Sequence, residues 1–373
     1  MSAVDIGMPL MGSRPPIYTQ PRERFVFLYP TTECSLRCKT CYVGNTRLNA
    51  ANTMTVEQAI EIMDYFKVTG GHDKLYLLGG EPTMHPQLPH IVREARDRSY
   101  TVTISSNGDF EDHVFDQIGP DLLGSFNFSL ESANPAVHRK IRGNPHNFDK
   151  VTDRIADARR RGYQVRVMCT VSKTNADRAL DLIPFLADLG AHTLSFHNLG
   201  KTGNGARFLQ PLSPTEWMDF CAQIEAHPPE PRLAVYYPPT FVHAEDQARW
   251  ADRGYPGCPA RTLDRPHVYP DGTVYACPVF MDDERYYARF EAGRLVLNPS
   301  PNNELNAYLT ADPECTGCPN TGTCGGGCPA YSQLPAYKEH GFYSCDRQIT
   351  PLCILWTVSA WGARPTDSLH ALR

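Results

Sequence analysis

Three cysteines near the start of the chain, Cys34, Cys38 and Cys41, follow one another in the pattern C-x3-C-x2-C. Three thiolates at this spacing can bind one face of a [4Fe–4S] cluster, which four cysteines normally hold. A set of three leaves one iron open, so that a substrate or cofactor can bind that iron directly. Structural zinc is the alternative, although zinc sites usually combine a close pair of cysteines with a second, distant pair. We therefore expect an iron–sulfur site here.

A second set of eight cysteines is concentrated between residues 258 and 353, whereas Cys169 and Cys221 stand alone and are interpreted as core residues. A disulfide scaffold is usually short and secreted, and a total of 13 cysteines leaves at least one unpaired in any scheme of disulfides alone. The segment is rich in glycine and proline and has little helical periodicity, so it needs a metal or covalent link to stay folded. We expect metal sites, and a pair of structural zinc sites is the alternative to iron–sulfur clusters.

The first three cysteines follow a β-rich run, and further β-rich runs then alternate with amphipathic stretches. Apolar residues recur at helical spacing in 56–68 and 176–189, and a later helix over 215–226 begins after Ser213-Pro214, a suitable cap and first turn. Six strand–helix alternations predict an α/β fold with a parallel sheet, either a partial (β/α)6 TIM-type barrel or an open doubly wound sheet. In such folds sites form at the carboxyl ends of strands, where Cys34–Cys41 lies. The expected strands are 24–29, 74–78, 101–105, 124–130, 164–171 and 192–197.

Composition excludes several classes of protein. The chain has 373 residues, a net charge of −5 and 41% hydrophobic residues, so it can build a sizeable core. No apolar run approaches the roughly 18 residues of a membrane span, and residues 1–23 contain no secretory signal, so we expect a cytoplasmic protein. An isoelectric point near 6.2 disfavours a general nucleic-acid binder. The expected division is an N-terminal arm (1–23), the partial barrel (24–226), a proline-rich bridge (227–257), a cysteine-rich domain (258–353) and a tail (354–373).

The C-x3-C-x2-C pattern directly after the first strand resembles the signature of radical S-adenosylmethionine enzymes. In that family the open iron chelates the amino and carboxylate groups of S-adenosylmethionine, and an electron from the cluster cleaves the sulfonium to give a 5′-deoxyadenosyl radical. Later segments are similar to the family's GGEP element, its TNG-type turn, its S-L-D element (with Glu for Asp) and an arginine that neutralises the methionine carboxylate. The cofactor-binding residues that this resemblance implies are Gly79, Gly80, Glu81, Pro82, Ser106, Asn107, Ser129, Glu131 and Arg142.

The second set of cysteines resembles the SPASM extension of the same superfamily, which carries two auxiliary [4Fe–4S] clusters. Its C-x3-C-Pro segment is similar to two-cluster ferredoxins, in which the last cysteine of a run binds the other cluster. The first auxiliary cluster then lacks one ligand, which Asp252, another non-thiolate or Cys353 supplies, unless the site is open to substrate. A hairpin over 268–276 presents one of the ligands. The resemblance assigns Cys258, Cys277 and Cys328 to the first auxiliary cluster, and Cys315, Cys318, Cys324 and Cys345 to the second.

The resemblance implies three [4Fe–4S] clusters, S-adenosylmethionine as cofactor, and hydrogen abstraction from an unactivated carbon. A peptide or protein substrate, as in ribosomal peptide maturation, is the first expectation, although Pro278 stands where sulfatase-maturating enzymes have an aspartate. The alternative is dehydrogenation or epimerisation of a small polar metabolite, such as an aminocyclitol or sugar, with Cys353 as an available hydrogen donor. A non-catalytic electron carrier is a further alternative. The expected partners are an electron donor such as flavodoxin or ferredoxin and a separate leader-peptide-binding protein, with no nucleic acid and no membrane.

Overall fold

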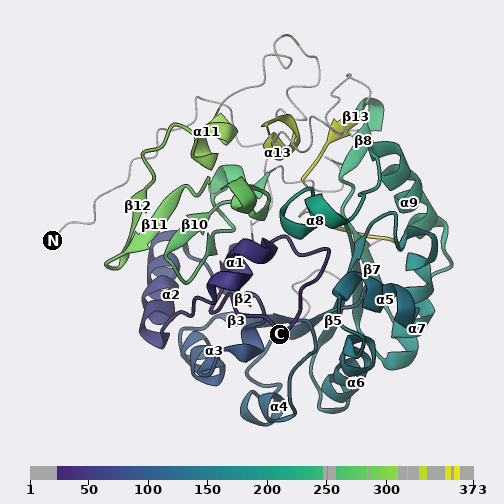
Figure 1. Cartoon of the computed structure of the whole chain (residues 1–373), viewed down its shortest axis with the longest axis horizontal. Coiled ribbons are helices and arrows are strands. Elements are labelled where there is room, and N and C mark those ends of the chain that lie inside the picture. Colours follow the sequence, from purple (N-terminus) through teal and green to yellow (C-terminus); the bar gives the residue numbers. More distant parts are fainter. Residues whose placement is uncertain are drawn as a thin grey trace.

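The computed structural model describes residues 23–246, 250, 258–283, 285–309, 317, 327–333, 349–353 and 357–361. The expected ligands Cys315, Cys318, Cys324 and Cys345 lie outside these residues, and so does Asp252. Most of the expected N-terminal arm (1–23) and C-terminal tail (354–373) also lies outside them. Figure 1 shows the described elements in a curved α/β arrangement.

A parallel sheet forms the centre of the molecule, and its first six strands agree with the sequence-based expectation to within one residue at each end. The apolar runs form strands because their alternating residues pack on both faces of a covered sheet. The expected segment 227–257, interpreted as a bridge, contains a seventh parallel strand that pairs with the sixth. The strands are β1 Phe25–Leu28, β2 Lys74–Leu77, β3 Thr101–Ser106, β4 Ser125–Ser129, β5 Val165–Val171, β6 Thr193–Asn198 and β7 Ala234–Tyr237, each hydrogen-bonded to the next.

The C-terminal part of the chain extends both edges of this sheet. Strand β9 (His267–Val268) pairs in parallel with β1 and starts an antiparallel hairpin with β10 (Thr273–Tyr275), as expected. At the other edge, β14 (Val358–Ser359) pairs with β7. A separate pair joins β8 (Phe241–His243) to β13 (Ile349–Pro351). With β11 (Ala288–Glu291) and β12 (Arg294–Leu297), the main sheet has twelve strands among the described residues.

Helices α2, α3, α4, α6, α7 and α9 lie around the outside of the curved sheet, whereas α1 and α8 lie nearer its centre (Figure 1). Capping boxes at Thr55 and Ser213 begin α2 and α9, the second as expected. The helices of this part are α1 Gly44–Ala50, α2 Val56–Gly70, α3 Leu88–Asp97, α4 His113–Gln117, α5 Pro135–Arg142, α6 Asn147–Arg160, α7 Leu182–Leu189, α8 Gly203–Phe208 and α9 Pro214–Ala226.

The continuous helix expected over 176–189 is split, because a 3-10 helix, η2 (Ala176–Asp181), precedes α7. Pro184 lies in the first turn of α7 and cannot donate a backbone hydrogen bond to the preceding turn, so an α-helix through this point is interrupted. Shorter elements complete the described part: η1 Pro82–Met84, η3 Ala244–Asp246, η4 Pro259–Thr262, η5 Pro278–Asp283, α11 Glu304–Leu309 and α13 Pro329–Gln333.

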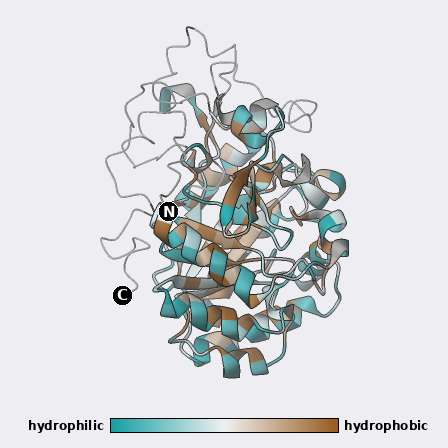
Figure 2. Ribbon diagram, turned by 90° about the vertical axis from the view of Figure 1, so that its left-hand side faces the viewer, coloured by the Kyte–Doolittle hydropathy of each residue, from teal (hydrophilic) through white to brown (hydrophobic). Residues whose placement is uncertain are grey.

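The core lies between the sheet and its surrounding helices, and Figure 2 shows hydrophobic residues concentrated on the central strands. Cys169 is fully buried in β5 and packs in this core, which confirms its interpretation as a core residue. Cys221 in α9 is half-buried against the same core. A search of the described residues finds no helix with the length and apolarity needed to cross a membrane.

Candidate active site

The cysteine loop, residues 34–41, follows the carboxyl end of β1 and is held by the loop that follows β2. Gly80 N–H donates to Thr31 O at 2.9 Å, and Glu81 N–H donates to Glu33 O at 2.7 Å. A Cβ atom on Gly80 would lie 2.2 Å from Glu33 O, and Gly79 has a φ of +142°. Only glycine permits this close approach of two backbones, so the GGEP element positions the cysteine loop.

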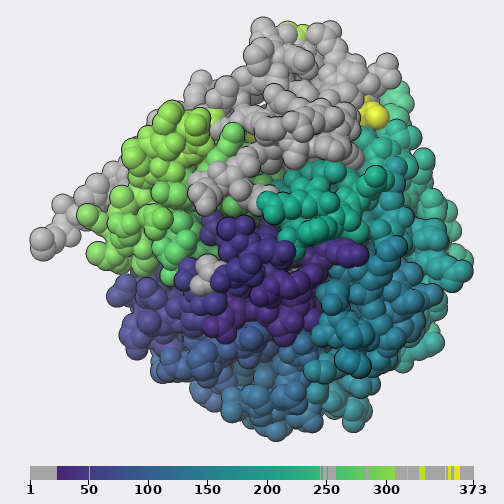
Figure 3. All heavy atoms as spheres, viewed as in Figure 1, coloured from purple at the N-terminus to yellow at the C-terminus, as the bar shows by residue number. Residues whose placement is uncertain are grey.

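The other side of the cysteine loop contacts the start of α8, which sequence analysis did not assign to the site. Asn204 donates from its backbone N–H to Cys41 O at 2.8 Å and from Nδ2 to Cys38 O at 2.9 Å. Gly203 has a φ of +54°, and a Cβ there would lie 2.4 Å from Cys41 O. The sequence feature that could have pointed to this contact is the glycine-containing run directly after the sixth expected strand. In Figure 3 the purple N-terminal segment reaches the surface between green and teal segments of later sequence.

The three thiols of the cysteine loop gather around Arg142, whose guanidinium interacts electrostatically with all of them. Burial raises the pKa of Cys34 and of Cys38 to about 11, and it also raises the pKa of Cys41. The positive charge of Arg142 acts in the opposite direction on each thiol and favours the thiolate. Backbone N–H of Leu36 and Nδ2 of Asn107 donate to the Cys34 sulfur at 3.4 and 3.7 Å. The Arg142 charge would therefore partly offset the cost of burying anionic sulfur ligands at this place.

Arg142 is held in place by Glu131 in a buried ion pair. Arg142 Nη1 lies 3.2 Å from Glu131 Oε1, and Glu131 Oε2 accepts the backbone N–H of Thr170 at 2.8 Å. Burial raises the pKa of Glu131, and the nearby Arg142 charge opposes that rise. Both Glu131 oxygens thus contact protein donors in this structure, and the carboxylate orients Arg142. Ser129, two residues earlier at the end of β4, is half-buried.

Glu81 is buried, and its carboxylate connects the GGEP element to the turn after β3. Its Oε2 accepts the backbone N–H of Asn107 at 2.7 Å, and Oε1 accepts the backbone N–H and hydroxyl of Thr83 at 3.2 and 2.7 Å. Ser106 also hydrogen-bonds to this carboxylate. Pro82 begins η1 directly afterwards. The structure therefore brings Glu81, Ser106 and Asn107 together beside Cys34.

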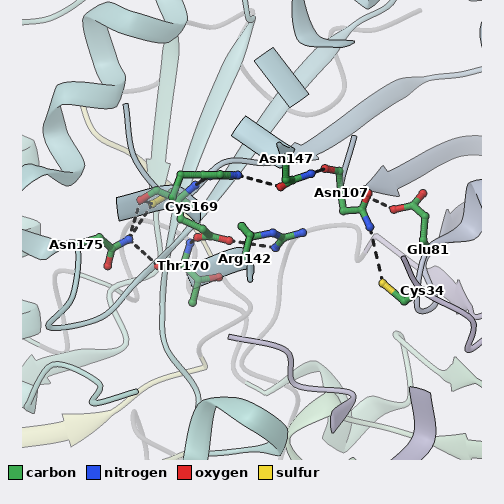
Figure 4. A network of polar contacts seen from close by, with 10 residues as sticks. Cys34, Glu81, Asn107, Arg142, Asn147, Cys169, Thr170 and Asn175 are labelled. Atoms are coloured by element: carbon green, nitrogen blue, oxygen red, sulfur yellow. Dashed lines mark hydrogen bonds and ion pairs between the residues drawn. The ribbon is translucent and has the colours of Figure 1, made fainter. Parts of the chain in front are cut away.

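A polar network joins these two parts of the site (Figure 4). Asn147 Nδ2 donates to Asn107 O at 3.0 Å, and Asn147 Oδ1 lies 2.9 Å from His138 Nε2. His138 Nδ1 accepts the backbone N–H of Glu131 at 3.1 Å, which fixes the proton of a neutral ring on Nε2. Burial lowers the pKa of His138 to about 4. The network thus fixes Glu131 relative to Asn107 with an uncharged imidazole.

An aromatic group links the cysteine loop to the β9–β10 hairpin. Tyr42, next to Cys41, hydrogen-bonds through its hydroxyl to Tyr29 Oη at 3.0 Å. Tyr29 stacks on Tyr269 with a centroid separation of 4.1 Å, and the Arg47 guanidinium lies 4.6 Å from the Tyr269 ring centroid. Tyr269 lies in the hairpin that leads to Cys277. The packing therefore couples the two cysteine-bearing segments.

The structure also brings together Cys258, Cys277 and Cys328, the three expected ligands of the first auxiliary cluster that it describes. Cys277 interacts electrostatically with both Cys328 and Cys258. Glu304 in α11 accepts the backbone N–H groups of Ala276 and Cys277 and so fixes the end of the hairpin. Within the described ranges, no three His, Cys, Asp or Glu side chains already form a group that could hold a single metal ion.

Residues 28–186 match the model of the Radical SAM superfamily, and this range contains the cysteine loop, the GGEP element, Glu131 and Arg142. The chain contains a radical SAM domain. The domain implies a [4Fe–4S] cluster and S-adenosylmethionine as cofactors, and the gathered thiols fit the cluster.

Curated relatives of the radical SAM domain are enzymes of heme and cofactor synthesis by name. The AdoMet-dependent heme synthase of Methanosarcina barkeri is 26% identical over 176 residues, 47% of this chain and 50% of the relative. The molybdenum cofactor biosynthesis protein 1 of Bos taurus is 30% identical over 204 residues, 52% of this chain and 31% of the relative. The GTP 3′,8-cyclase of Aquifex aeolicus is 26% identical over 257 residues, 66% of this chain and 79% of the relative. The chain thus spans half or less of the first two relatives.

Solved structures show the likeness of the whole fold. SuiB of Streptococcus suis bound to precursor peptide SuiA has a TM-score of 0.64 at 16% identity, over 84% of this chain and 74% of SuiB. Native anSMEcpe with bound AdoMet and Cp18Cys peptide has a TM-score of 0.56 at 17% identity, over 88% of this chain and 98% of that chain. At this level of identity the likeness concerns the fold, and it extends beyond the radical SAM domain.

Proposed function

We propose that this enzyme cleaves S-adenosylmethionine reductively at a cluster bound by Cys34, Cys38 and Cys41, and that it removes a hydrogen atom from an unactivated carbon of a peptide. When bound, the reduced cluster supplies the electron for this cleavage, and the cofactor supplies the 5′-deoxyadenosyl radical. The observation that carries the proposal is the gathering of three thiols around one buried arginine at the carboxyl end of β1.

Arg142 supports this proposal because part of its guanidinium is available. Its Nη1 contacts Glu131, whereas its buried Nε has no hydrogen-bond partner among the residues that the structure describes. A buried donor without a partner is costly, and an anionic ligand would satisfy it. We assign Arg142 to the carboxylate of the cofactor, with Glu131 as the residue that orients it. The backbone of Gly79 to Pro82, together with Ser106, Asn107 and Ser129, would complete the cofactor site.

We propose that the C-terminal cysteines bind two auxiliary clusters, for a total of three, in a SPASM domain. Cys258, Cys277 and Cys328 would hold one, and their proximity supports this. Cys315, Cys318, Cys324 and Cys345, outside the described residues, would hold the other. A bound auxiliary cluster offers a place for one electron from an oxidised substrate. The clustered free thiols also support a cytoplasmic location, where thiols stay reduced.

The proposal of a peptide substrate is inferred from the likeness of the fold to two solved structures. Both structural neighbours were solved with a peptide, and the likeness covers most of this chain. A small polar metabolite is the second candidate, because the relatives named as heme synthase and GTP cyclase act on small molecules by name. We propose flavodoxin or ferredoxin as electron donor and a separate protein that binds a leader peptide. Mass spectrometry of peptides encoded beside the gene, and of sugars and aminocyclitols, after incubation with the reduced enzyme would distinguish the two classes.

The test of cofactor cleavage uses anaerobically prepared protein, dithionite and S-adenosylmethionine. The protein should contain about twelve irons if three clusters form. Replacing Cys34, Cys38 and Cys41 together by alanine should leave about eight and abolish 5′-deoxyadenosine. Cys221→Ala, a half-buried thiol in α9, is the matched control and should change neither quantity. Zinc in place of iron, or iron without 5′-deoxyadenosine from the unmodified chain, would contradict the proposal and favour a zinc protein or an electron carrier.

A further inference from the structure

The fourth cysteine of the described C-terminal part, Cys353, lies beside the three expected auxiliary ligands. The Cys353 thiol hydrogen-bonds to the Cys258 sulfur. Cys258 in turn interacts electrostatically with Cys277 and with Cys328. Cys277, Cys328 and Cys353 are buried, with exposed fractions of 8%, 8% and 5%. Segments that are far apart in the sequence thus bring four thiols to one buried place.

The position of Cys353 is fixed by backbone pairing. Strand β13 pairs with β8 through Pro351 and Phe241, and Leu352 N–H donates to Thr240 O at 2.7 Å. Cys353 follows directly after these contacts, so its backbone is held against the edge formed by β8. The short spacing leaves this thiol little freedom to move away from Cys258.

Backbone amides and one cation lie beside these buried sulfurs. Cys258, Cys277 and Cys328 are each followed by proline at the start of a helical turn, η4, η5 and α13. Backbone amides just beyond each proline stabilise the sulfur: those of Ala260 and Arg261, of Val279, and of Ala330 and Tyr331. The charge of Arg261 acts on Cys258 and Cys328 in the same sense. Such amide contacts and a nearby cation are what an anionic thiolate-bound cluster requires.

We propose that Cys353 is the fourth ligand of the first auxiliary cluster, which is then bound by four cysteines and has no iron open to substrate. This inference rests on the proposed function, because it assumes that Cys258, Cys277 and Cys328 bind a cluster. Each thiol releases its proton to solvent when the sulfur binds iron. A fully coordinated cluster can exchange electrons with its surroundings without binding the substrate. The assignment also removes Cys353 from consideration as a hydrogen-atom donor.

The test isolates the auxiliary clusters by working in the chain that carries Cys34→Ala, Cys38→Ala and Cys41→Ala. This background should contain about eight irons. Adding Cys353→Ala should lower the content to about seven, with the EPR signal of an oxidised [3Fe–4S] cluster, or to about four if the whole cluster is lost. Adding Cys353→Ser, whose oxygen can still bind iron, should retain more iron with an altered EPR signal. Adding Cys221→Ala should leave the iron content and the EPR signal as they are in the background variant.

Three results would overturn the inference while leaving the proposed function intact. The first is a Cys353→Ala variant with the iron content and EPR signal of its background, as expected for an open iron. The second is loss of iron on Asp252→Ala instead, which would assign the fourth position to that carboxylate. The third is a Cys258–Cys353 disulfide in iron-loaded protein, detected by mass spectrometry after anaerobic denaturation. A background variant without iron would instead contradict the auxiliary clusters themselves.

Discussion

The guanidinium of Arg142 forms a buried ion pair with Glu131, with 3.2 Å between Nη1 and Oε1. Arg142→Met should lower the free energy of unfolding by about 3–5 kcal/mol, because it leaves Glu131 buried without its partner. The double variant Arg142→Met/Glu131→Gln should regain most of that loss, since neither charge then remains. The double variant should still bind S-adenosylmethionine about ten- to hundredfold more weakly than the unmodified chain, because it lacks the charge-assisted hydrogen bond from Arg142.

Urea denaturation measures the free energy of unfolding of each variant, and equilibrium dialysis measures its affinity for S-adenosylmethionine. If the double variant bound the cofactor as tightly as the unmodified chain, Arg142 would have only a structural role.

Gly80→Ala should disturb the first cluster site without affecting the auxiliary one. The new Cβ would lie 2.2 Å from Glu33 O and would push the GGEP element away from the cysteine loop. We expect loss of about four irons per chain and of 5′-deoxyadenosine formation. Gly119→Ala is the matched control, because its Cβ would meet only the movable side-chain oxygen of Asp121. Iron analysis of both variants checks this, and equal iron contents would refute it.

Asn204→Ala should loosen the cysteine loop from the side of α8. The substitution leaves Cys38 O and Asn45 Oδ1 without the amide that they accept, at 2.9 Å each, and should cost about 1–3 kcal/mol of unfolding free energy. We also expect faster loss of the first cluster in air, followed by absorbance. The exposed Asn302→Ala should stay within about 0.5 kcal/mol of the unmodified chain. Equal rates of cluster loss would contradict the assigned role.

His138 should make stability depend on pH. Its pKa is about 4 in the folded chain and near 6.5 when unfolded, so between these values the unfolded chain binds the extra proton. The free energy of unfolding should therefore be highest above about pH 6.5 and fall by about 3 kcal/mol as the pH drops to 4.

Other buried histidines titrate as well, so the informative quantity is the difference from His138→Gln, which lacks this contribution. Unfolding curves at several pH values for both chains supply it. Two curves that stay parallel from pH 7 to 4.5 would show that His138 does not titrate in this way.

The six expected strands were predictable because each is a short apolar run between polar helices, and tertiary packing preserved the pattern. Strand β7 was missed because its four residues lie between prolines, whose usual meaning is a break in regular structure. The spacing of its three cysteines alone was enough to single out the cysteine loop as a candidate site. Asn204 was not assigned to the site, and Cys353 was only one of several candidates for the missing auxiliary ligand. Each reaches its place through pairings between segments distant in sequence, which periodicity does not encode.

Pairing of β9 with β1 places the two groups of thiols on one hydrogen-bonded ladder, through Phe27 N–H to Pro266 O and Tyr29 N–H to Val268 O, each at 2.9 Å. The gap between the redox centres proposed here is then set in part by the backbone geometry of β1 and β9. A slip of one residue between β1 and β9 would shift one centre by about 3.3 Å against the other, and hopping slows steeply over such a distance.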